Sequence, residues 1–244
     1  MDNIPLNKKL ILITGAAKRI GRTLALSCAQ AGADVIIHYG HSKSAALDTQ
    51  NQIKSMGRQA WILAADLTKP DEISDLILEV SKIGSPYALI NSASLFGTLT
   101  LKETSLSDWE KHIAVNLTAP FLLSQGFARL IEKNIIGRIV NILDWRAFRP
   151  GADHFPYTVS KAGLAALTKS LAVALAPNII VNGLALGAIL PPEDQPVASD
   201  ILKFVPASRW GSLQEIGETL IFLLTGPTYL TGDIINLDGG RHLI

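Results

Sequence analysis

The chain has 244 residues and a formal net charge of +1, with 22 Lys and Arg residues against 21 Asp and Glu residues. A balance so close to neutral gives no electrostatic reason to expect binding to nucleic acid or to an anionic membrane. The only cysteine, Cys28, excludes an internal disulfide, and there is no zinc-type Cys/His cluster, so we expect a fold that rests on a large apolar core and holds no metal.

Seven short apolar runs recur along the chain, and most are followed by a longer segment with helical spacing. The runs are continuous rather than alternating, which is typical of parallel strands covered on both faces. The predicted strands are Leu10–Thr14, Val35–His38, Ala60–Ala64, Tyr87–Asn91, Arg138–Leu143, Ile179–Leu184 and Ile234–Leu237. The predicted helices are Ile20–Ala31, Ser44–Ser55, Asp71–Lys82, Asp108–Glu132, Pro156–Ala176 and Leu213–Leu223.

Strands that alternate with helices predict right-handed crossovers and a parallel sheet. We therefore predict an α/β fold in which residues 1–244 form a single Rossmann domain, with a doubly wound parallel sheet of about seven strands and helices on both faces. A long irregular segment at about 187–210, rich in proline, is predicted to be a substrate-binding loop.

Residues able to do chemistry follow six of the predicted strands, and in such sheets ligands bind beyond the carboxyl ends of the strands. These residues are, in strand order, Gly15, His41, Asp66, Asn91, Asp144 and Gly187. Their convergence predicts a single crevice with a bound ligand.

The turn Thr14–Gly21 joins the first strand to the first helix. Its glycines allow a tight approach to a pyrophosphate, which the free N–H groups of a helix N-terminus would bind. The second strand ends without the acidic residue that usually binds the ribose of NAD. His41, Ser42 and Lys18 are instead candidates for a 2′-phosphate, although each could be plain surface, and this predicts NADPH/NADP+ as the cofactor.

Tyr157 and Lys161 lie four residues apart at the start of a predicted helix and so share one face. A nearby ammonium is expected to lower the pKa of the phenol into the range useful for proton transfer. Pro120 lies inside a predicted helix and has no N–H for the carbonyl of Asn116, which is therefore free to hold a water, unless the proline only kinks the helix.

These residues, together with Asn91-Ser92-Ala93, resemble the short-chain dehydrogenase/reductase family over essentially the whole chain. The resemblance implies that Tyr157 donates a proton, that Lys161 lowers its pKa and binds the nicotinamide ribose, and that Asn116 positions a water. The cofactor-binding set comprises Gly15, Lys18, Arg19, Ile20, Gly21, His41, Ser42, Asp66, Leu67, Asn91, Ala93, Tyr157, Lys161 and Gly187. Asp66 would contact the adenine edge, or alternatively cap the helix that follows.

Two departures from the family pattern resemble its pteridine reductase and dihydromonapterin reductase branch. Arg19 replaces the usual middle glycine of the turn, and Asp144 replaces the usual catalytic serine. The branch implies a catalytic set of Asp144, Tyr157, Lys161 and Asn116, with Phe96 as a stacking platform and with Ser94 and Arg19 as further substrate contacts. A pterin presents C=N bonds and an amino-pyrimidinone edge to which a carboxyl group is suited.

The expected function is reduction by NADPH of a small molecule, a dihydropterin such as dihydromonapterin, dihydrobiopterin or dihydrofolate. The alternatives are a carbonyl reductase acting on a 3-oxoacyl thioester, and a catalytically silent member that senses NADP. The structural alternative for Asp144 is a residue that caps the turn before Trp145, and the alternative for Phe96 is packing within a lid. The polar start and the absence of a long apolar run predict a cytoplasmic protein.

A homotetramer is expected, because the predicted helix Pro156–Ala176 is apolar on more than one face and the family pairs this helix and Leu213–Leu223 across two-fold axes. Arg241 and His242 would line a neighbouring subunit's site or form a loose tail.

Overall fold

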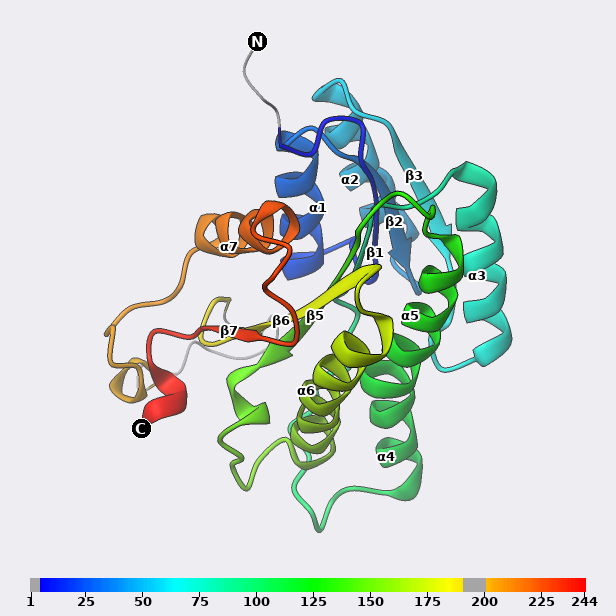
Figure 1. Cartoon of the computed structure of the whole chain (residues 1–244). Helices are drawn as coiled ribbons and strands as arrows, with labels where there is room; N and C mark the ends of the chain where they lie inside the picture. Colours follow the sequence, from blue (N-terminus) through cyan, green and yellow to red (C-terminus); the bar gives the residue numbers. More distant parts are fainter. Residues whose placement is uncertain (1–4, 191–200) are drawn as a thin grey trace.

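A seven-stranded parallel sheet runs through the centre of the molecule in the computed structural model, which describes residues 5–190 and 201–244 (Figure 1). The strands lie in the order β3-β2-β1-β4-β5-β6-β7, and every neighbouring pair is parallel. Their bounds are Leu10–Ile13 (β1), Asp34–Tyr39 (β2), Ala60–Ala64 (β3), Ala88–Asn91 (β4), Gly137–Asp144 (β5), Ile179–Leu186 (β6) and Ile234–Leu237 (β7). The predicted fold class is confirmed.

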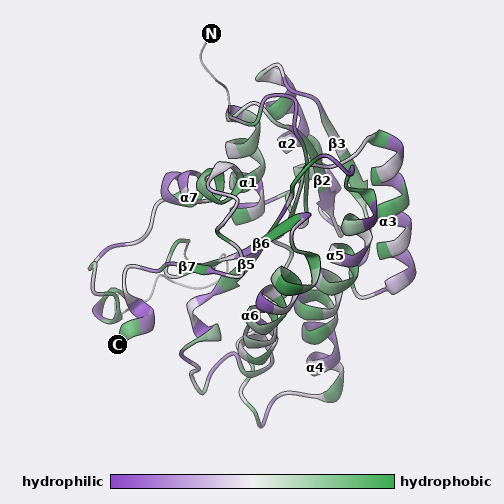
Figure 2. Cartoon of the chain, in the orientation of Figure 1, coloured by the Kyte–Doolittle hydropathy of each residue, from purple (hydrophilic) through white to green (hydrophobic). Residues whose placement is uncertain are grey.

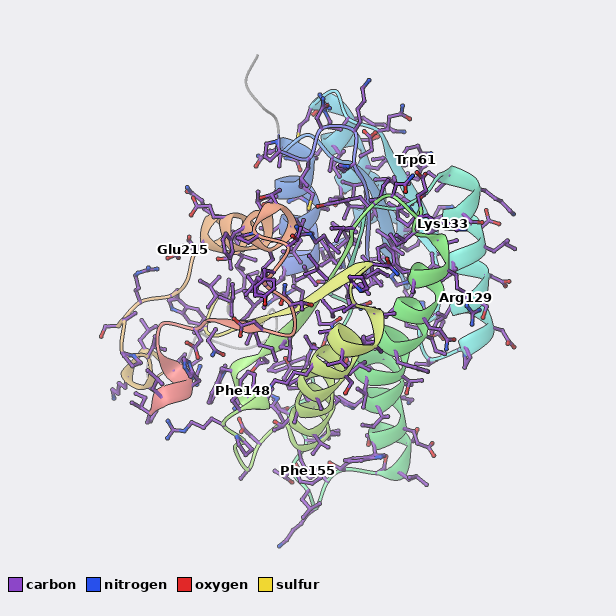
Figure 3. The ribbon with its side chains drawn as sticks, in the orientation of Figure 1. Trp61, Arg129, Lys133, Phe148, Phe155 and Glu215 are labelled. Carbon is purple, nitrogen blue, oxygen red and sulfur yellow. The ribbon has the colours of Figure 1, made fainter. Side chains whose placement is uncertain are left out.

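Helices cover both faces of the sheet, as the continuous apolar strands require. One layer comprises α1 (Arg19–Gln30), α2 (Lys43–Ser55) and α7 (Leu213–Thr225), and the other comprises α3 (Pro70–Ile83), α4 (Leu106–Ile113), α5 (Ala119–Leu130) and α6 (Phe155–Leu175). Figure 3 shows Glu215 of α7 on one side of the molecule and Arg129 of α5 on the other.

Two large apolar clusters fill the spaces between the sheet and these layers, and a third, smaller one joins β5 and β6 to α6. One joins β1 and β2 to α1 and α7, with Leu24 and Leu220 fully buried. The other joins β4 and β5 to α3 and α5, with Leu123 and Phe127 fully buried. Hydropathy follows the same division, since green apolar positions of the helices turn toward the sheet and purple ones away from it (Figure 2).

The predicted helix Asp108–Glu132 is interrupted. A π-helical turn over Ala114–Thr118 separates α4 from α5, and the N–H of Ala119 bonds to the carbonyl of Ala114, five residues back. Pro120, which has no N–H to give, follows directly. The prediction of one continuous helix was wrong in this detail, and the π-turn brings Asn116 to the cavity side of the layer.

Strand order reverses between β1 and β4, because β2 and β3 extend to one side of β1 and β5 to β7 extend to the other. Such a switch point opens a crevice at the carboxyl ends of the strands. Of the predicted substrate-binding loop at 187–210, residues 191–200 lie outside the described residues, and the remainder includes a short 3₁₀ turn at Ile201–Phe204. No helix within residues 5–190 and 201–244 is long and apolar enough to cross a membrane.

Candidate active site

A cavity of about 740 Å³ lies at the switch point, within the size range of small-molecule sites. Its wall includes residues that follow six different strands, as the sequence predicts. The predicted site residues that line it are Gly15, Lys18, Arg19, Ile20, Gly21, His41, Asp66, Leu67, Ala93, Ser94, Phe96, Asp144, Tyr157, Lys161 and Gly187. Ser42, Asn91 and Asn116 do not line it.

The turn after β1 requires its glycines. Gly15 has a φ of +63°, and a Cβ on it would lie 2.8 Å from the Cα of Ala93. A Cβ on Gly21 would collide with the carbonyl oxygen of Gly15. The helix that follows has no side-chain cap on its N-terminal N–H groups and no acidic residue in its first turn. A backbone that a ligand can approach closely, with helix N–H groups that no side chain caps, is suited to bind a pyrophosphate.

Arg19 adopts a left-handed conformation with a φ of +51°. A non-glycine residue there costs about 1–2 kcal/mol relative to glycine, which explains why glycine is the usual residue at this place in the turn. The arginine is thus held at some cost in stability beside the cavity that it lines.

His38 holds this turn in place, and sequence reasoning did not assign it a role. The N–H of Gly15 donates to its Nδ1 at 3.1 Å, and its Nε2 lies 3.0 Å from the carbonyl oxygen of Ala65. Burial lowers the pKa of His38, which keeps the ring neutral with Nε2 as the donor. The signal in the sequence was a single polar residue within the apolar run of β2.

The far end of the cavity carries the residues predicted to hold a 2′-phosphate. Lys18 and His41 line it, whereas Ser42 is the N-cap residue that precedes α2, and its hydroxyl makes no capping bond. Asp66 lines the cavity, as a contact to the adenine edge requires, and it accepts hydrogen bonds from the N–H and the hydroxyl of Thr68. It does not cap α3, whose N-cap residue is Lys69 and whose N-terminus has no side-chain cap.

Asp144, Tyr157 and Lys161 meet at the opposite end. The Tyr157 hydroxyl donates to Oδ2 of Asp144 at 3.1 Å, while Oδ1 accepts from the N–H of Arg146 at 2.9 Å. The Lys161 ammonium donates to the carbonyl oxygen of Ile142 at 2.8 Å and lies 5.7 Å from the Tyr157 ring centroid. Asp144 therefore caps the turn after β5 and also faces the phenol.

The expected lowering of the Tyr157 pKa is not what the structure gives. Burial raises the pKa of Tyr157 well above its usual range, and the Asp144 carboxylate raises it further. Burial also raises the pKa of Asp144 and lowers that of Lys161 to about 8. The prediction was wrong in sign chiefly because Tyr157 is buried, and also because its hydroxyl faces a carboxylate while the ammonium is bonded to Ile142. A phenol with a raised pKa keeps its proton at neutral pH but is a weaker acid than a free tyrosine.

Two asparagines expected at the site lie beneath its surface. Nδ2 of Asn91 donates to Oδ1 of Asn141 at 2.8 Å, which ties β4 to β5. Oδ1 of Asn116 accepts from the N–H of Leu95 at 2.8 Å, and its Nδ2 donates to the Leu95 carbonyl and to the Ser160 hydroxyl. The side chain of Asn116 is thus occupied in holding the segment that carries Ser94 and Phe96.

Phe96 lies beside Tyr157 at the cavity wall. The two ring centroids are 4.8 Å apart and nearly perpendicular, and Phe96 is 56% exposed. Such an aromatic ring beside an Asp–Tyr pair offers a flat ligand a stacking surface.

Two further segments were expected at the site, the carboxyl end of β6 and the C-terminal turn. A Cβ on Gly187 would lie 2.5 Å from the Cα of Asp238, so this close approach needs a glycine. Arg241 packs on the ring of Trp145, 4.2 Å from its centroid, and His242 bonds to Asp238 at 2.8 Å. Within one chain the tail is thus held in place rather than loose, and neither residue lines the cavity.

Comparison with known proteins relates this geometry to a family. A profile described as short chain dehydrogenase matches residues 9–201. The chain is 33% identical over 240 residues to a 3-oxoacyl-(acyl-carrier-protein) reductase of Synechocystis sp., and the match covers 96% of this chain and 97% of that protein. It is 34% identical over 248 residues to a 2-dehydro-3-deoxy-D-gluconate 5-dehydrogenase of Bacillus subtilis, with 98% and 96% covered. Among solved structures, FolM alternative dihydrofolate reductase 1 of Brucella canis, complexed with NADP, matches with a TM-score of 0.92 at 33% identity, over 100% of this chain and 97% of that chain.

Proposed function

The chain belongs to the short chain dehydrogenase family, and from that premise we propose that it is an NADPH-dependent reductase of a dihydropteridine. The observation that carries the substrate class is the hydrogen bond between Asp144 and Tyr157 in the cavity wall, next to Phe96. A carboxyl group there can accept the N–H bonds of a pterin edge, which a serine hydroxyl does less well. The likeness to a solved dihydrofolate reductase complexed with NADP supports the same substrate class.

The chemistry divides between the cofactor and the chain. When bound, NADPH supplies the hydride, which a carbon of the substrate C=N bond accepts. The Tyr157 hydroxyl, which is protonated at neutral pH, donates its proton to the nitrogen as the carbon accepts the hydride, so NADP+ and the tetrahydropterin are the products. Asp144 orients the phenol, and the buried Lys161, with a pKa lowered to about 8, lies with its ammonium 5.7 Å from the centroid of the Tyr157 ring.

The cofactor is NADPH/NADP+, and we expect a preference over NADH that depends on Lys18. One charge-assisted hydrogen bond to the 2′-phosphate contributes about 1.5–3 kcal/mol, equivalent to roughly 10- to 100-fold in kcat/KM. Lys18→Ala should remove most of this preference, and His41→Ala should remove part of it. Lys43→Ala is the matched control, because Lys43 lies near the same strand end but does not line the cavity. Steady-state kinetics with both cofactors measures the effect, and equal kcat/KM values in the wild type would contradict it.

A 3-oxoacyl thioester reductase is the second candidate, favoured by the 33% identity to the Synechocystis reductase. The experiment that separates the two candidates follows NADPH absorbance with a panel of dihydropterins and 3-oxoacyl esters. Efficient turnover of a dihydropterin and slow turnover of the esters supports the proposal, and the reverse result replaces it with the second candidate.

We also propose that the protein is a homotetramer. Helix α6 buries Leu164 against the sheet but leaves Val173 83% exposed, and Phe222 of α7 is also exposed. Apolar side chains on the outer faces of two helices fit two further interfaces. Multi-angle light scattering should give the mass of a tetramer at micromolar concentration, and a monomer mass would contradict the proposal. Val173→Asp should shift the protein to smaller species.

A further inference from the structure

His154 supports Phe96 from the side away from the cavity. The two rings stack with centroids 4.3 Å apart and planes 25° apart. Phe96 lines the cavity and His154 does not, and only 6% of His154 is exposed. Phe96 therefore lies between His154 and the cavity, so its plane is set by a buried ring behind it.

The backbone and hydrogen bonds of His154 fix it in this position. It precedes α6 with a φ of +52°, a left-handed conformation that is uncommon outside glycine. Its Nδ1 lies 2.7 Å from the carbonyl oxygen of Gly97, next to Phe96 in the chain. Burial lowers the pKa of His154, so the neutral ring donates from Nδ1. Figure 3 shows Phe155, the following residue, at the start of α6.

The same histidine is connected to the catalytic pair. Its Nε2 lies 3.4 Å from Oδ2 of Asp153, which is bonded to Arg146 at 2.8 Å. The N–H of Arg146 donates to Asp144, and Asp144 accepts from Tyr157, whose ring meets the edge of Phe96. Because the neutral His154 ring carries its proton on Nδ1, its Nε2 makes no hydrogen bond to Asp153, and the contact between His154 and Tyr157 runs through the Phe96 ring.

We infer that His154 is a positioning residue that holds the Phe96 ring perpendicular to the Tyr157 ring and thereby makes the site selective for flat heteroaromatic substrates. The inference rests on the proposed function, since a stacking platform matters for a pterin and hardly for an acyclic ketone. It acts through Phe96, so its contribution should be absent when Phe96 is absent.

A double-mutant cycle tests this. His154→Asn keeps a residue that tolerates the left-handed backbone and an N–H donor for Gly97, but removes the ring. We expect KM for a dihydropterin to rise about three- to tenfold, as for the loss of one aromatic pair, with kcat changed less than twofold. In the Phe96→Ala background the same substitution should add nothing. KM for a 3-oxoacyl ester should not change.

The control is His112→Asn, which removes a second buried histidine that lies near Gly97 but, among the described residues, has no ring contact with Phe96. It should leave KM for the pterin unchanged. If His154→Asn does not fold, as thermal unfolding would reveal, His154→Gly replaces it, because glycine adopts the left-handed backbone freely.

Additive effects of His154→Asn and Phe96→Ala on KM, or an equal rise for the ester, would overturn the inference while leaving the proposed function intact. If the wild type turns over no dihydropterin, the proposed function fails, and a crystal structure of His154→Asn then decides the inference: a Phe96 ring that keeps its plane contradicts it, and a displaced or disordered ring supports it.

Discussion

Replacing Tyr157 by phenylalanine should lower kcat by about 10²–10⁴-fold, the usual contribution of a positioned general acid. The substitution removes the hydroxyl that donates to Asp144 at 3.1 Å and keeps the ring that meets the edge of Phe96. Cofactor contacts elsewhere in the cavity are untouched, so NADPH should still bind, as a fluorescence titration can show. A low kcat with a near-normal Kd for NADPH is the expected combination.

Stability is the control for this variant. The phenol is one of two hydrogen-bond donors to the buried Asp144 carboxyl group, and its loss should destabilise the fold by about 1–3 kcal/mol. A modest drop in Tm is therefore compatible with the prediction. A variant that keeps most of the wild-type kcat for any substrate in the panel would remove Tyr157 from the chemistry.

Asp144→Ser should reduce dihydropterin turnover strongly, mainly in kcat, because the carboxyl group both orients the Tyr157 hydroxyl and serves the pterin edge. It restores the serine that the family usually carries, so turnover of 3-oxoacyl esters should hold or rise. The ratio of kcat/KM for the two substrate classes is the measurement. Should the variant instead lose ester reduction that the wild type performs well, Asp144 would belong to ketone chemistry.

The pH dependence of kcat/KM provides a second test of the Asp144→Ser variant. The Asp144 carboxylate raises the pKa of Tyr157 and also that of Lys161. Removing its charge lowers both pKa values, so the alkaline limb of kcat/KM should move to lower pH whichever of the two groups governs it. Asp144→Asn, which keeps the shape and removes the charge, should show the same displacement. An unmoved limb in both variants would mean that the charge of Asp144 does not act on the titrating group.

Much of the fold was open to prediction because it depends on local pattern. The strands Ala60–Ala64 and Ile234–Leu237 were predicted with the bounds that the structure gives, and the others differ by one or two residues at an end. Continuous apolar runs of this length, separated by helical spacing, have few arrangements other than a parallel sheet covered on both faces. The crevice followed from the same pattern, since parallel strands bring their carboxyl ends to one edge.

Local irregularities of the helices and the partners of buried side chains were harder to predict from the sequence. Pro120 predicted a break in the hydrogen bonding of the helix, but its spacing did not predict the π-turn over Ala114–Thr118, which contacts α4, α5 and α6. Asn91 was predicted to bind the cofactor and Asn116 to position a water. Their side chains, however, bind protein groups 50 and 21 residues away rather than the cavity.

The sequence by itself determined the fold class, the glycine turn, the shared face of Tyr157 and Lys161 and the residues that gather at the strand ends, because each depends on short-range spacing. Only the tertiary structure decided how those groups act on one another. Asp144 reaches the Tyr157 hydroxyl across 13 positions, Lys161 turns to the carbonyl of Ile142, and His154 meets Gly97 across 57 positions. The direction of a pKa shift and the plane of an aromatic ring depend on burial and on neighbours a few ångströms away, and these exist only once the sheet and its helices have packed.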